Sequence, residues 1–490
     1  MPTAEEITRH LVEHVLPDSL AGFLTTQRWF GGKARPIDRV AVNDFVWLAG
    51  APQTNGLCIV EVTYTRGPAE RYALVIGRRD EPGDAPVVAN PTADNPAWII
   101  EASADADGAY ALMAGFLAAA TLPTLREGML RFADATALTA DVVSSRPPVR
   151  AVGAEQSNTS VRLGPGLVFK LLRRLEDGEN PELEMGRFLT TRTAFRAMPA
   201  LHGSVTAENR DGHGATVAIV QTWVDSHGDG WSHMLAALTS RSDAEGALES
   251  LGRDLEQLGA TTAEFHAAMA SDAEAPAFAP EAATAGDVEA WTAALATQTA
   301  EALHLVLGAA LDPEMKQMLE QALTTCVRAG TTSAPPVGRT SGDGFPKIRI
   351  HGDYHLGQTL KTTSGFVLLD FEGEPTRPLA ERRRKHCALK DVAGMLRSFD
   401  YALATVCHGD EAASAAVEAQ FNPRGRFLDG YMKVALRGRA PVVPEHPEAR
   451  AAWTRFFELE KALYELSYEV NNRPSWAPIP ARAILRLLRG

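Results

Sequence analysis

Two short motifs in the C-terminal half constrain this chain more than any other feature of its sequence. The first is His351-Gly352-Asp353-Tyr354-His355-Leu356-Gly357-Gln358, and the second is Leu368-Leu369-Asp370-Phe371-Glu372-Gly373. The apolar residues around them predict a strand, a loop and a second strand that ends in acidic residues. Either motif alone could be an ordinary strand with a polar turn. The two together, at this spacing, favour a functional loop.

The spacing of the polar residues is typical of phosphoryl transfer. Asp353 and Gln358 have the five-residue offset of the catalytic Asp and the metal-binding Asn of protein kinases, and Asp370 stands at the end of an apolar strand, as their metal-binding Asp does. Transfer of a phosphoryl group to a hydroxyl needs a base-like carboxylate and metal ligands that neutralise charge. We therefore expect Asp353 to be the base. Gln358 and Asp370 are expected to hold Mg²⁺, which prefers oxygen ligands.

A polar hairpin tip upstream is a candidate for contact with ATP phosphates. Residues 155–163 precede Gly164-Pro165-Gly166, a turn signal between two expected strands. The tip residues that could fold over phosphates are Ser157, Asn158 and Thr159. The tip has no GxGxxG pattern, so a plain hairpin is the better explanation of this segment taken alone.

Lys170 stands on the strand after this hairpin, where a kinase-like lobe carries its phosphate-binding lysine. Glu184 on the next expected helix is the favoured ion-pair partner of Lys170. Glu182 is its competitor, since the phase of one helical turn cannot be read from the sequence. The strand that closes this half could present backbone groups to adenine through its last residues, Gln221, Trp223 and Val224.

A helical block near the C-terminus is a candidate wall for a sugar. Glu460, Lys461 and Tyr464 recur at helical spacing within residues 457–480. Carboxylates can accept hydrogen bonds from sugar hydroxyls, and aromatic rings can stack on apolar sugar faces. His355, beside the expected base, completes this substrate-binding set. An ordinary amphipathic helix is the alternative explanation.

Other conspicuous residues are expected to be structural. His266 lies on a helical face and is predicted to support the catalytic loop. The segment Gln27–Arg35 contains GGK but lacks the spacing of a Walker motif, so we expect a packed turn with Trp29 and Phe30 in the core. The four cysteines show neither CxxC nor Cys/His metal spacing, which predicts reduced thiols.

Composition narrows the class of partner. The 490 residues include 48 Lys and Arg against 61 Asp and Glu, a net charge of −13 that argues against nucleic acid. The longest apolar stretch, Tyr110–Leu122, is too short to span a bilayer, and the N-terminus does not resemble a secretory signal. These features predict a cytoplasmic globular protein with neither a nucleic acid nor a membrane as partner.

Five segments together resemble maltokinases, the ATP-dependent maltose 1-kinases of the aminoglycoside phosphotransferase and protein-kinase-like superfamily. The segments are QRWFGGK, HGDYHLGQTL, LLDFEGEPTRPLAERR, KDVAGMLRSFDYA and FELEKALYELSYEVNNRPSW. The resemblance implies a bilobal α+β fold. Its expected parts are a cap subdomain over residues 1–105, an intermediate subdomain that completes the N-lobe over residues 106–224, and a helical C-lobe over residues 225–490.

The same resemblance implies ATP and Mg²⁺ as cofactors, Asp353 as base, Gln358 and Asp370 as metal ligands and Lys170 as the phosphate lysine. Related phosphotransferases commonly have Asn at position 358, and Gln fits the maltokinase branch. We therefore expect a monomeric or homodimeric kinase that phosphorylates maltose. One alternative is an aminosugar (glucosamine) or aminoglycoside kinase. Another is a catalytically silent nucleotide-binding module, although the intact set of motif residues argues against it.

Overall fold

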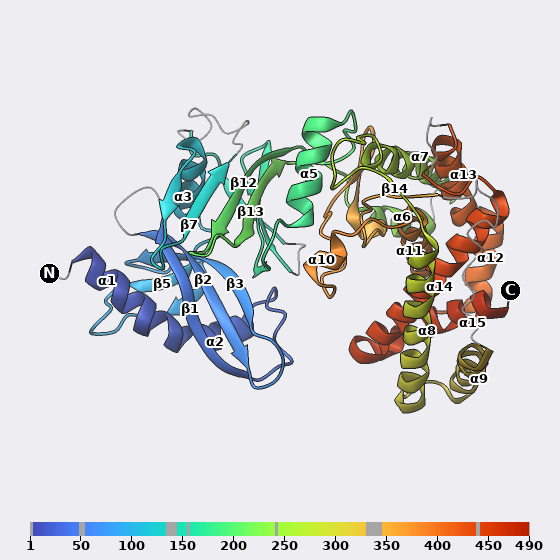
Figure 1. Ribbon diagram of the computed structural model, residues 1–490, viewed down its shortest axis with the longest axis horizontal. Helices are drawn as coiled ribbons and strands as arrows, with labels where there is room; N and C mark the ends of the chain where they lie inside the picture. Colours follow the sequence, from blue (N-terminus) through green and yellow to red (C-terminus); the bar gives the residue numbers. More distant parts are fainter. Residues whose placement is uncertain are drawn as a thin grey trace. The chain divides into compact units, whose positions relative to one another are not determined.

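The computed structural model describes residues 3–48, 54–133, 145–153, 157–240, 244–329, 345–437 and 442–489. The chain forms two compact units (Figure 1). The N-terminal unit contains Met1–Arg187 and Pro199–Val224, and the second unit contains Phe188–Met198 and Asp225–Gly490.

The N-terminal unit begins with helices that cover one face of an antiparallel sheet. Its described elements are α1 (Ala4–His10), η1 (Leu11–Val15), α2 (Leu16–Thr26), β1 (Ile37–Trp47), β2 (Asn55–Tyr64), β3 (Glu70–Arg79), β4 (Val87–Ala89), β5 (Trp98–Glu101) and β11 (Arg174–Leu175). The strand order is β1-β2-β3-β5-β4, and β11 pairs with β3. Leu16, Leu20 and Leu24 recur every four residues along α2, so they form one apolar face that is buried against the sheet.

A second sheet follows in the same unit. The elements of this part are α3 (Ala106–Leu117), β6 (Thr121–Pro123), β7 (Met129–Ala133), β8 (Val149–Val152), β9 (Thr159–Leu163), β10 (Leu167–Leu171), α5 (Pro181–Arg192), β12 (Leu201–Glu208) and β13 (Gly214–Thr222). The last residues of α5, from Phe188 onward, belong to the second unit. The strand order is β6-β7-β12-β13-β10-β9-β8. The predicted hairpin is the β9–β10 pair, and Gly164 makes its turn with a φ of 60°. Lys170 lies on β10, between β9 and β13.

The two sheets of the N-terminal unit share one hydrophobic core. Leu57, Val75 and Ile100 from the first sheet belong to the same buried cluster as Phe132 and Phe169 from the second. Helix α3 adds Leu112, Met113 and Phe116 to this cluster. Because apolar burial is the main favourable term in folding, the two sheets are expected to depend on one another for stability.

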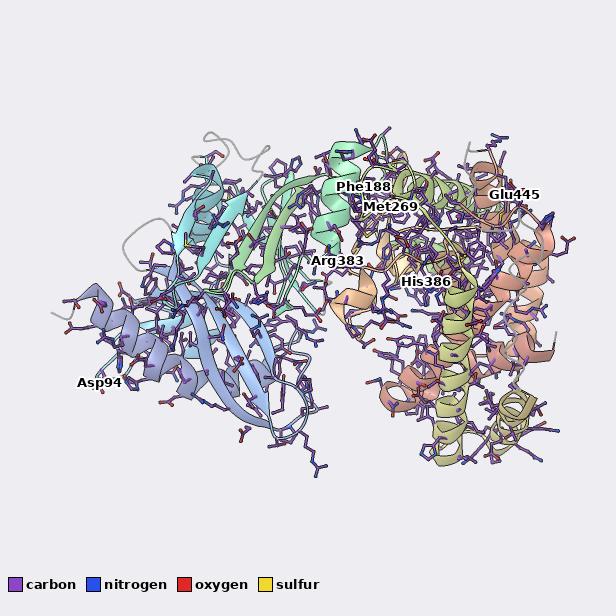
Figure 2. The ribbon with its side chains drawn as sticks, in the orientation of Figure 1. Asp94, Phe188, Met269, Arg383, His386 and Glu445 are labelled. Atoms are coloured by element: carbon purple, nitrogen blue, oxygen red, sulfur yellow. The ribbon has the colours of Figure 1, made fainter. Side chains whose placement is uncertain are left out.

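The second unit is mostly helical, with two short hairpins. Its described elements are α6 (Gly230–Leu238), α7 (Ala244–Met269), β14 (Glu281–Ala282), α8 (Ala285–Gly308), α9 (Pro313–Ala329), β15 (Pro346–Lys347), η2 (Leu356–Gln358), β16 (Thr359–Thr362), β17 (Gly365–Leu368), α10 (Leu379–Arg382), α11 (Leu389–Val406), α12 (Glu411–Phe421), α13 (Pro423–Ala435), α14 (Pro447–Asn472), η3 (Pro474–Trp476) and α15 (Pro478–Arg489). Phe188, labelled in Figure 2, stacks on Phe278 at 3.8 Å between ring centroids.

This architecture confirms the predicted fold class, a kinase-like α+β fold with an N-terminal β-rich cap and a helical C-terminal region. In the part of the chain that the structure describes, no helix is both long and apolar enough to cross a membrane.

Candidate active site

The β16–β17 hairpin brings the two expected metal ligands together. Thr359 pairs with Leu368, so the residues just outside this pair, Gln358 and Leu369, are neighbours as well. The Leu369 N–H donates to the Gln358 carbonyl at 2.9 Å. Gln358 Nε2 then lies 3.2 Å from Asp370 Oδ2. Here the Gln358 amide nitrogen faces the carboxylate; with the amide turned over, its oxygen and the Asp370 carboxylate would offer the hard oxygen atoms that suit Mg²⁺, so the two residue types fit the predicted ion.

His351 joins the catalytic loop to the strand that carries Asp370. Its Nε2 lies 2.7 Å from the Leu369 carbonyl, and its Nδ1 lies 3.4 Å from the backbone nitrogen of Asp353. A carbonyl only accepts and an N–H only donates, so these contacts fit a ring that donates from Nε2 and accepts at Nδ1. The orientation of the loop is therefore coupled to that of the acidic strand end.

A buried carboxylate anchors the start of the loop. Asp391 accepts hydrogen bonds from the backbone N–H groups of His351 (2.7 Å) and Gly352 (2.9 Å). His266 Nε2 lies 3.0 Å from the same carboxylate, and His266 Nδ1 lies 2.8 Å from the Tyr431 hydroxyl. Burial acts to raise the pKa of Asp391, but the hydrogen bond from His266 and the other contacts outweigh it and lower this pKa. The prediction that His266 supports the loop is confirmed.

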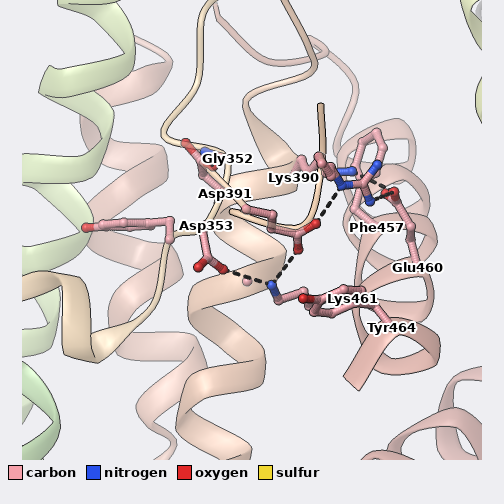
Figure 3. Close-up of a pocket in the computed structure, with 12 residues that line it drawn as sticks. Gly352, Asp353, Lys390, Asp391, Phe457, Glu460, Lys461 and Tyr464 are labelled. Carbon is pink, nitrogen blue, oxygen red and sulfur yellow. Dashed lines mark hydrogen bonds and ion pairs between the residues drawn. The ribbon is translucent and has the colours of Figure 1, made fainter. Parts of the chain in front are cut away.

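A pocket opens beside Asp353 within the helical unit (Figure 3). It is formed by the catalytic loop, the segment after Asp370, and helices α11 and α14. Its lining residues are Gly352, Asp353, Tyr354, Glu374, Arg377, Lys390, Asp391, Gly394, Phe457, Glu460, Lys461 and Tyr464. The structure therefore brings together the predicted base and three of the predicted sugar-binding residues, Glu460, Lys461 and Tyr464.

His355 has a different environment. Its Nδ1 accepts a hydrogen bond from the Gly357 N–H at 3.1 Å, in the turn that begins η2. Burial lowers the pKa of His355, and the nearby Asp353 charge only partly opposes this effect. The ring caps its own loop and is not among the lining residues found in the described chain. The pocket thus gives no support to the prediction that His355 binds substrate.

Lys461 connects the predicted base to a second carboxylate. Its Nζ lies 3.1 Å from Asp353 Oδ1 and 2.8 Å from Glu374 Oε1. Burial acts to raise the pKa of Glu374, but Lys461 and Arg377 outweigh it and hold this pKa at about 2. Burial likewise acts to lower the pKa of Lys461, and the Asp353 and Glu374 charges raise it well above its usual range. Both groups are therefore charged at neutral pH.

Glu460 also has a cationic partner. Its Oε1 lies 2.6 Å from Lys390 Nζ and 3.6 Å from Arg377 Nη2. The carboxylate lies in the wall of the pocket, with 17% of its side chain exposed. Tyr464 adds an aromatic face, and its ring centroid is 4.9 Å from Lys461 Nζ.

In the N-terminal unit, Lys170 pairs with Glu182. Lys170 Nζ lies 2.7 Å from Glu182 Oε2, and the two side chains are 6% and 3% exposed. Glu184 was the favoured partner and Glu182 its competitor, and the ion pair in the structure is with Glu182. Glu184 is also buried on α5. Sequence could not decide between them because the two residues are only two positions apart on one helix, and their phase depends on how α5 packs.

Residues 159–163 of the predicted hairpin tip form strand β9, and the buried Arg173 contacts two of the candidate side chains. Arg173 Nε donates to Thr159 Oγ1 at 2.8 Å, and the Arg173 N–H donates to Asn158 Oδ1 at 3.2 Å. These contacts favour a structural role for the two side chains. Ser157 is exposed, whereas Glu155 of the predicted tip lies outside the described residues.

The predicted adenine segment lies at the end of β13. Gln221 is buried in the strand, and the Trp223 N–H donates to the Gly166 carbonyl at 2.8 Å. The Trp223 ring lies under Arg162, with 4.4 Å from the guanidinium carbon to the ring centroid. Val224 is the last residue of the N-terminal unit.

Sequence reasoning missed several charged residues of the site. Asp391 and Lys390 lie in KDVAGMLRSFDYA, and Glu374 and Arg377 lie in LLDFEGEPTRPLAERR. Both segments contributed to the family resemblance, but no spacing rule assigned a role to these residues. A charged pair inside an otherwise apolar helical run, as at 390–391, is the local signal that could have indicated them.

The fold and the motif geometry define a phosphotransferase with a kinase-like fold. Residues 148–373 match the phosphotransferase enzyme family, and residues 23–105 match the maltokinase N-terminal cap domain. Two stretches of the chain are thus similar to a phosphotransferase domain and to a maltokinase-type cap.

Two curated relatives are glucosamine kinases. One from Mycolicibacterium smegmatis is 29% identical over 343 residues, which cover 69% of this chain and 79% of the relative. One from Streptacidiphilus jiangxiensis is 26% identical over 343 residues, which cover 69% of this chain and 73% of the relative.

Solved structures show the same fold along nearly the whole chain. A glucosamine kinase in complex with glucosamine, ADP and inorganic phosphate has a TM-score of 0.66 at 20% identity, and covers 95% of this chain and 98% of that one. Crystal form B of a glucosamine kinase has a TM-score of 0.69 at 21% identity, and the match covers 98% of this chain and 99% of that one.

Proposed function

We propose that this protein is an ATP-dependent sugar kinase that transfers the ATP γ-phosphate to the anomeric hydroxyl of maltose. The observation that carries the proposal is the pocket in which Asp353 faces Lys461, Glu460 and Tyr464. A base-like carboxylate beside hydrogen-bonding groups and an aromatic ring suits a sugar hydroxyl as phosphoryl acceptor. The maltokinase-type cap favours maltose among sugars.

In this proposal, Asp353 orients the sugar hydroxyl and takes its proton. The hydroxyl oxygen bonds to the γ-phosphorus, and the bond from that phosphorus to the bridging oxygen breaks, which leaves ADP. Lys170, held by Glu182, would bind phosphate oxygens. Gln358 and Asp370 would hold Mg²⁺. When bound, that ion neutralises charge on the phosphates.

A glucosamine kinase is the second candidate, because the two curated relatives carry that name. An aminoglycoside kinase is grouped with it as an alternative, because residues 148–373 match the phosphotransferase enzyme family. A silent nucleotide-binding module is the third possibility, and it would bind ATP without transferring phosphate. The cytoplasm stays our predicted compartment for each of these candidates.

Release of ADP, measured with maltose, glucose, glucosamine and kanamycin as acceptors, separates these candidates. We expect the highest kcat/KM with maltose, and a product of one maltose and one phosphate by mass spectrometry. A preference for glucosamine or kanamycin would instead establish the corresponding alternative. ATP binding with no acceptor-dependent ADP release would establish the silent module.

The role of Asp353 is tested by Asp353→Asn, which keeps the size of the side chain and removes the base. Turnover should fall by about 10²–10⁴-fold, the range for loss of a general base. Nucleotide affinity, measured by isothermal titration calorimetry, should stay within about threefold of wild type, since the carboxylate does not bind ATP. Turnover close to that of wild type would show that another group acts as the base.

A further inference from the structure

The charges around the pocket are balanced by side chains of the protein itself. Three carboxylates face the pocket: those of Asp353, Glu374 and Glu460. Lys461 pairs with the first two, and Lys390 lies 2.6 Å from the third. Arg377 is the third cation, 2.5 Å from Glu374 and 3.6 Å from Glu460.

Asp391, the remaining carboxylate of the lining, is engaged elsewhere. It accepts hydrogen bonds from the backbone of the catalytic loop and lies 3.0 Å from His266. The pocket therefore offers hydrogen-bonding groups to a ligand. Each carboxylate that lines it, however, already has a cationic or hydrogen-bonding partner in the described chain.

Lys390 is the cation that neutralises Glu460 most directly. Its Nζ lies 2.6 Å from Glu460 Oε1, whereas Arg377 Nη2 lies 3.6 Å from the same oxygen. Arg377 also serves Glu374 and Glu381, so its charge is shared among carboxylates. Lys390 and Glu460 are both mostly buried, with 19% and 17% of their side chains exposed. Partial burial strengthens the effect of one missing charge relative to a surface site.

We propose that Lys390 is a specificity-determining residue, which by neutralising Glu460 makes the pocket favour an uncharged sugar over an amino sugar. This inference rests on the proposed sugar-kinase function. An ammonium group on the ligand would meet the Lys390 charge and would find no unpaired carboxylate among the residues that line the pocket. A hydroxyl could still accept from Lys390 and donate to the second oxygen of Glu460.

Glucose and glucosamine provide a matched pair of ligands, since they differ only in the hydroxyl or amino group at one carbon. The experiment compares their equilibrium affinities by calorimetry, and their kcat/KM by ADP release, in wild type and Lys390→Gln. For both quantities, we expect the ratio of the glucosamine value to the glucose value to rise about tenfold or more in the variant. The reason is that Lys390→Gln leaves one unpaired negative charge in a partly buried site. Maltose is assayed in parallel.

Two further variants separate charge from structure. Lys390→Arg keeps the positive charge, so its glucosamine to glucose ratio should stay near that of wild type. Lys385→Gln is the matched control, because Lys385 pairs with Glu281 and is not part of the pocket lining. It should change neither the ratio nor the activity.

Several results would overturn the role of Lys390. These are an unchanged ratio in a folded Lys390→Gln protein, an equal shift in Lys390→Arg, or the absence of binding of both sugars to wild type and variant. Failure of the proposed kinase function looks different. In that case the affinities would shift as expected, but no sugar would stimulate ADP release.

Discussion

At the scale of single residues, several charges of the candidate site are buried in ion pairs. Lys170 and Glu182 are nearly inaccessible to solvent, and Glu374 is only 4% exposed beside Lys461 and Arg377. A buried charge is tolerated because its partner is in place, so loss of one partner leaves an uncompensated charge. Single substitutions here should therefore have larger effects than at surface pairs.

The Lys170–Glu182 pair can be tested with a double-mutant cycle. Lys170→Met and Glu182→Gln should each destabilise the protein by about 3–5 kcal/mol, since each removes an ion-pair partner from a buried charge. The double variant should be more stable than the sum of the two losses predicts. Urea unfolding of the four proteins measures this coupling. Strictly additive losses would show that the two side chains do not act as a pair.

Glu374 should give stability that depends on pH in the acid range. Its folded pKa of about 2 lies below its ordinary value of 4.5. The stability from ionised Glu374 is therefore complete above about pH 4.5 and is lost as the pH falls towards 2. The advantage of wild type over Glu374→Gln should be on the order of 3 kcal/mol at pH 7, and should shrink between pH 4.5 and 2.

Urea unfolding at pH 7, 4 and 3 measures this advantage. Glu381→Gln is the control, because Glu381 contacts the same arginine but is 38% exposed, so its effect should be small throughout. An advantage of wild type over Glu374→Gln that is equal at all three pH values would contradict the assigned pKa shift.

At the scale of elements, one face of α11 supports the catalytic loop. Asp391 binds the loop backbone, and Ser398 Oγ accepts from the Leu356 N–H at 3.1 Å. Gly394 lies between them in the helix, and a Cβ there would be 2.6 Å from the Tyr354 carbonyl oxygen. Residues 391, 394 and 398 share a face because they are three and four positions apart. The helix thus sets the position of the loop through both contacts and close approach.

Gly394→Ala should therefore impair catalysis. The added methyl group must push the Tyr354 carbonyl away and shift Asp353 with it, and a misplacement of about 1 Å can cost on the order of 100-fold in rate. We expect kcat to fall while the far-ultraviolet circular dichroism is unchanged. Gly22→Ala on α2 is the control, since its Cβ would meet no atom within 4 Å. Equal kcat for Gly394→Ala and wild type would disprove the close approach.

At the scale of the whole molecule, the N-terminal cap belongs to the same compact unit as the second sheet. The shared core joins the two sheets, and Arg173 adds a polar connection. Its Nη1 lies 2.9 Å from Glu101 of the first sheet, and its Nε donates to Thr159 of the second. Arg173 is 1% exposed, and its guanidinium lies over the Trp29 ring at 4.4 Å.

Arg173→Met should destabilise the N-terminal unit by about 3–5 kcal/mol, because it leaves buried Glu101 without its cation. Differential scanning calorimetry should show a lower transition temperature. Arg174→Met is the matched control, since its side chain is 46% exposed and pairs with Glu70 at 3.3 Å. Similar transition temperatures for both variants would show that Arg173 does not stabilise this unit.

Short sequence motifs predicted more residues of the candidate site than the overall composition did. Gln358 and Asp370 could be paired from the sequence because a short antiparallel hairpin joins them, and the register of a hairpin follows from its turn. The structural role of His266 was predicted, but its partner Asp391 was not. Phe30 is buried as expected, whereas Trp29 is only partly buried and packs against Arg173.

The sequence by itself determined the resemblance to kinase-like phosphotransferases, the fold class and the hairpin that joins Gln358 to Asp370. These features depend on spacings of about a dozen residues, which local backbone geometry converts directly into proximity. Only the tertiary structure decided that Glu182 pairs with Lys170, and that Lys390 and Lys461 neutralise the carboxylates beside Asp353. Lys390 and Glu460 are 70 residues apart, and Lys461 and Asp353 are 108 apart. Contacts at such separations depend on how whole helices pack, which no local spacing specifies.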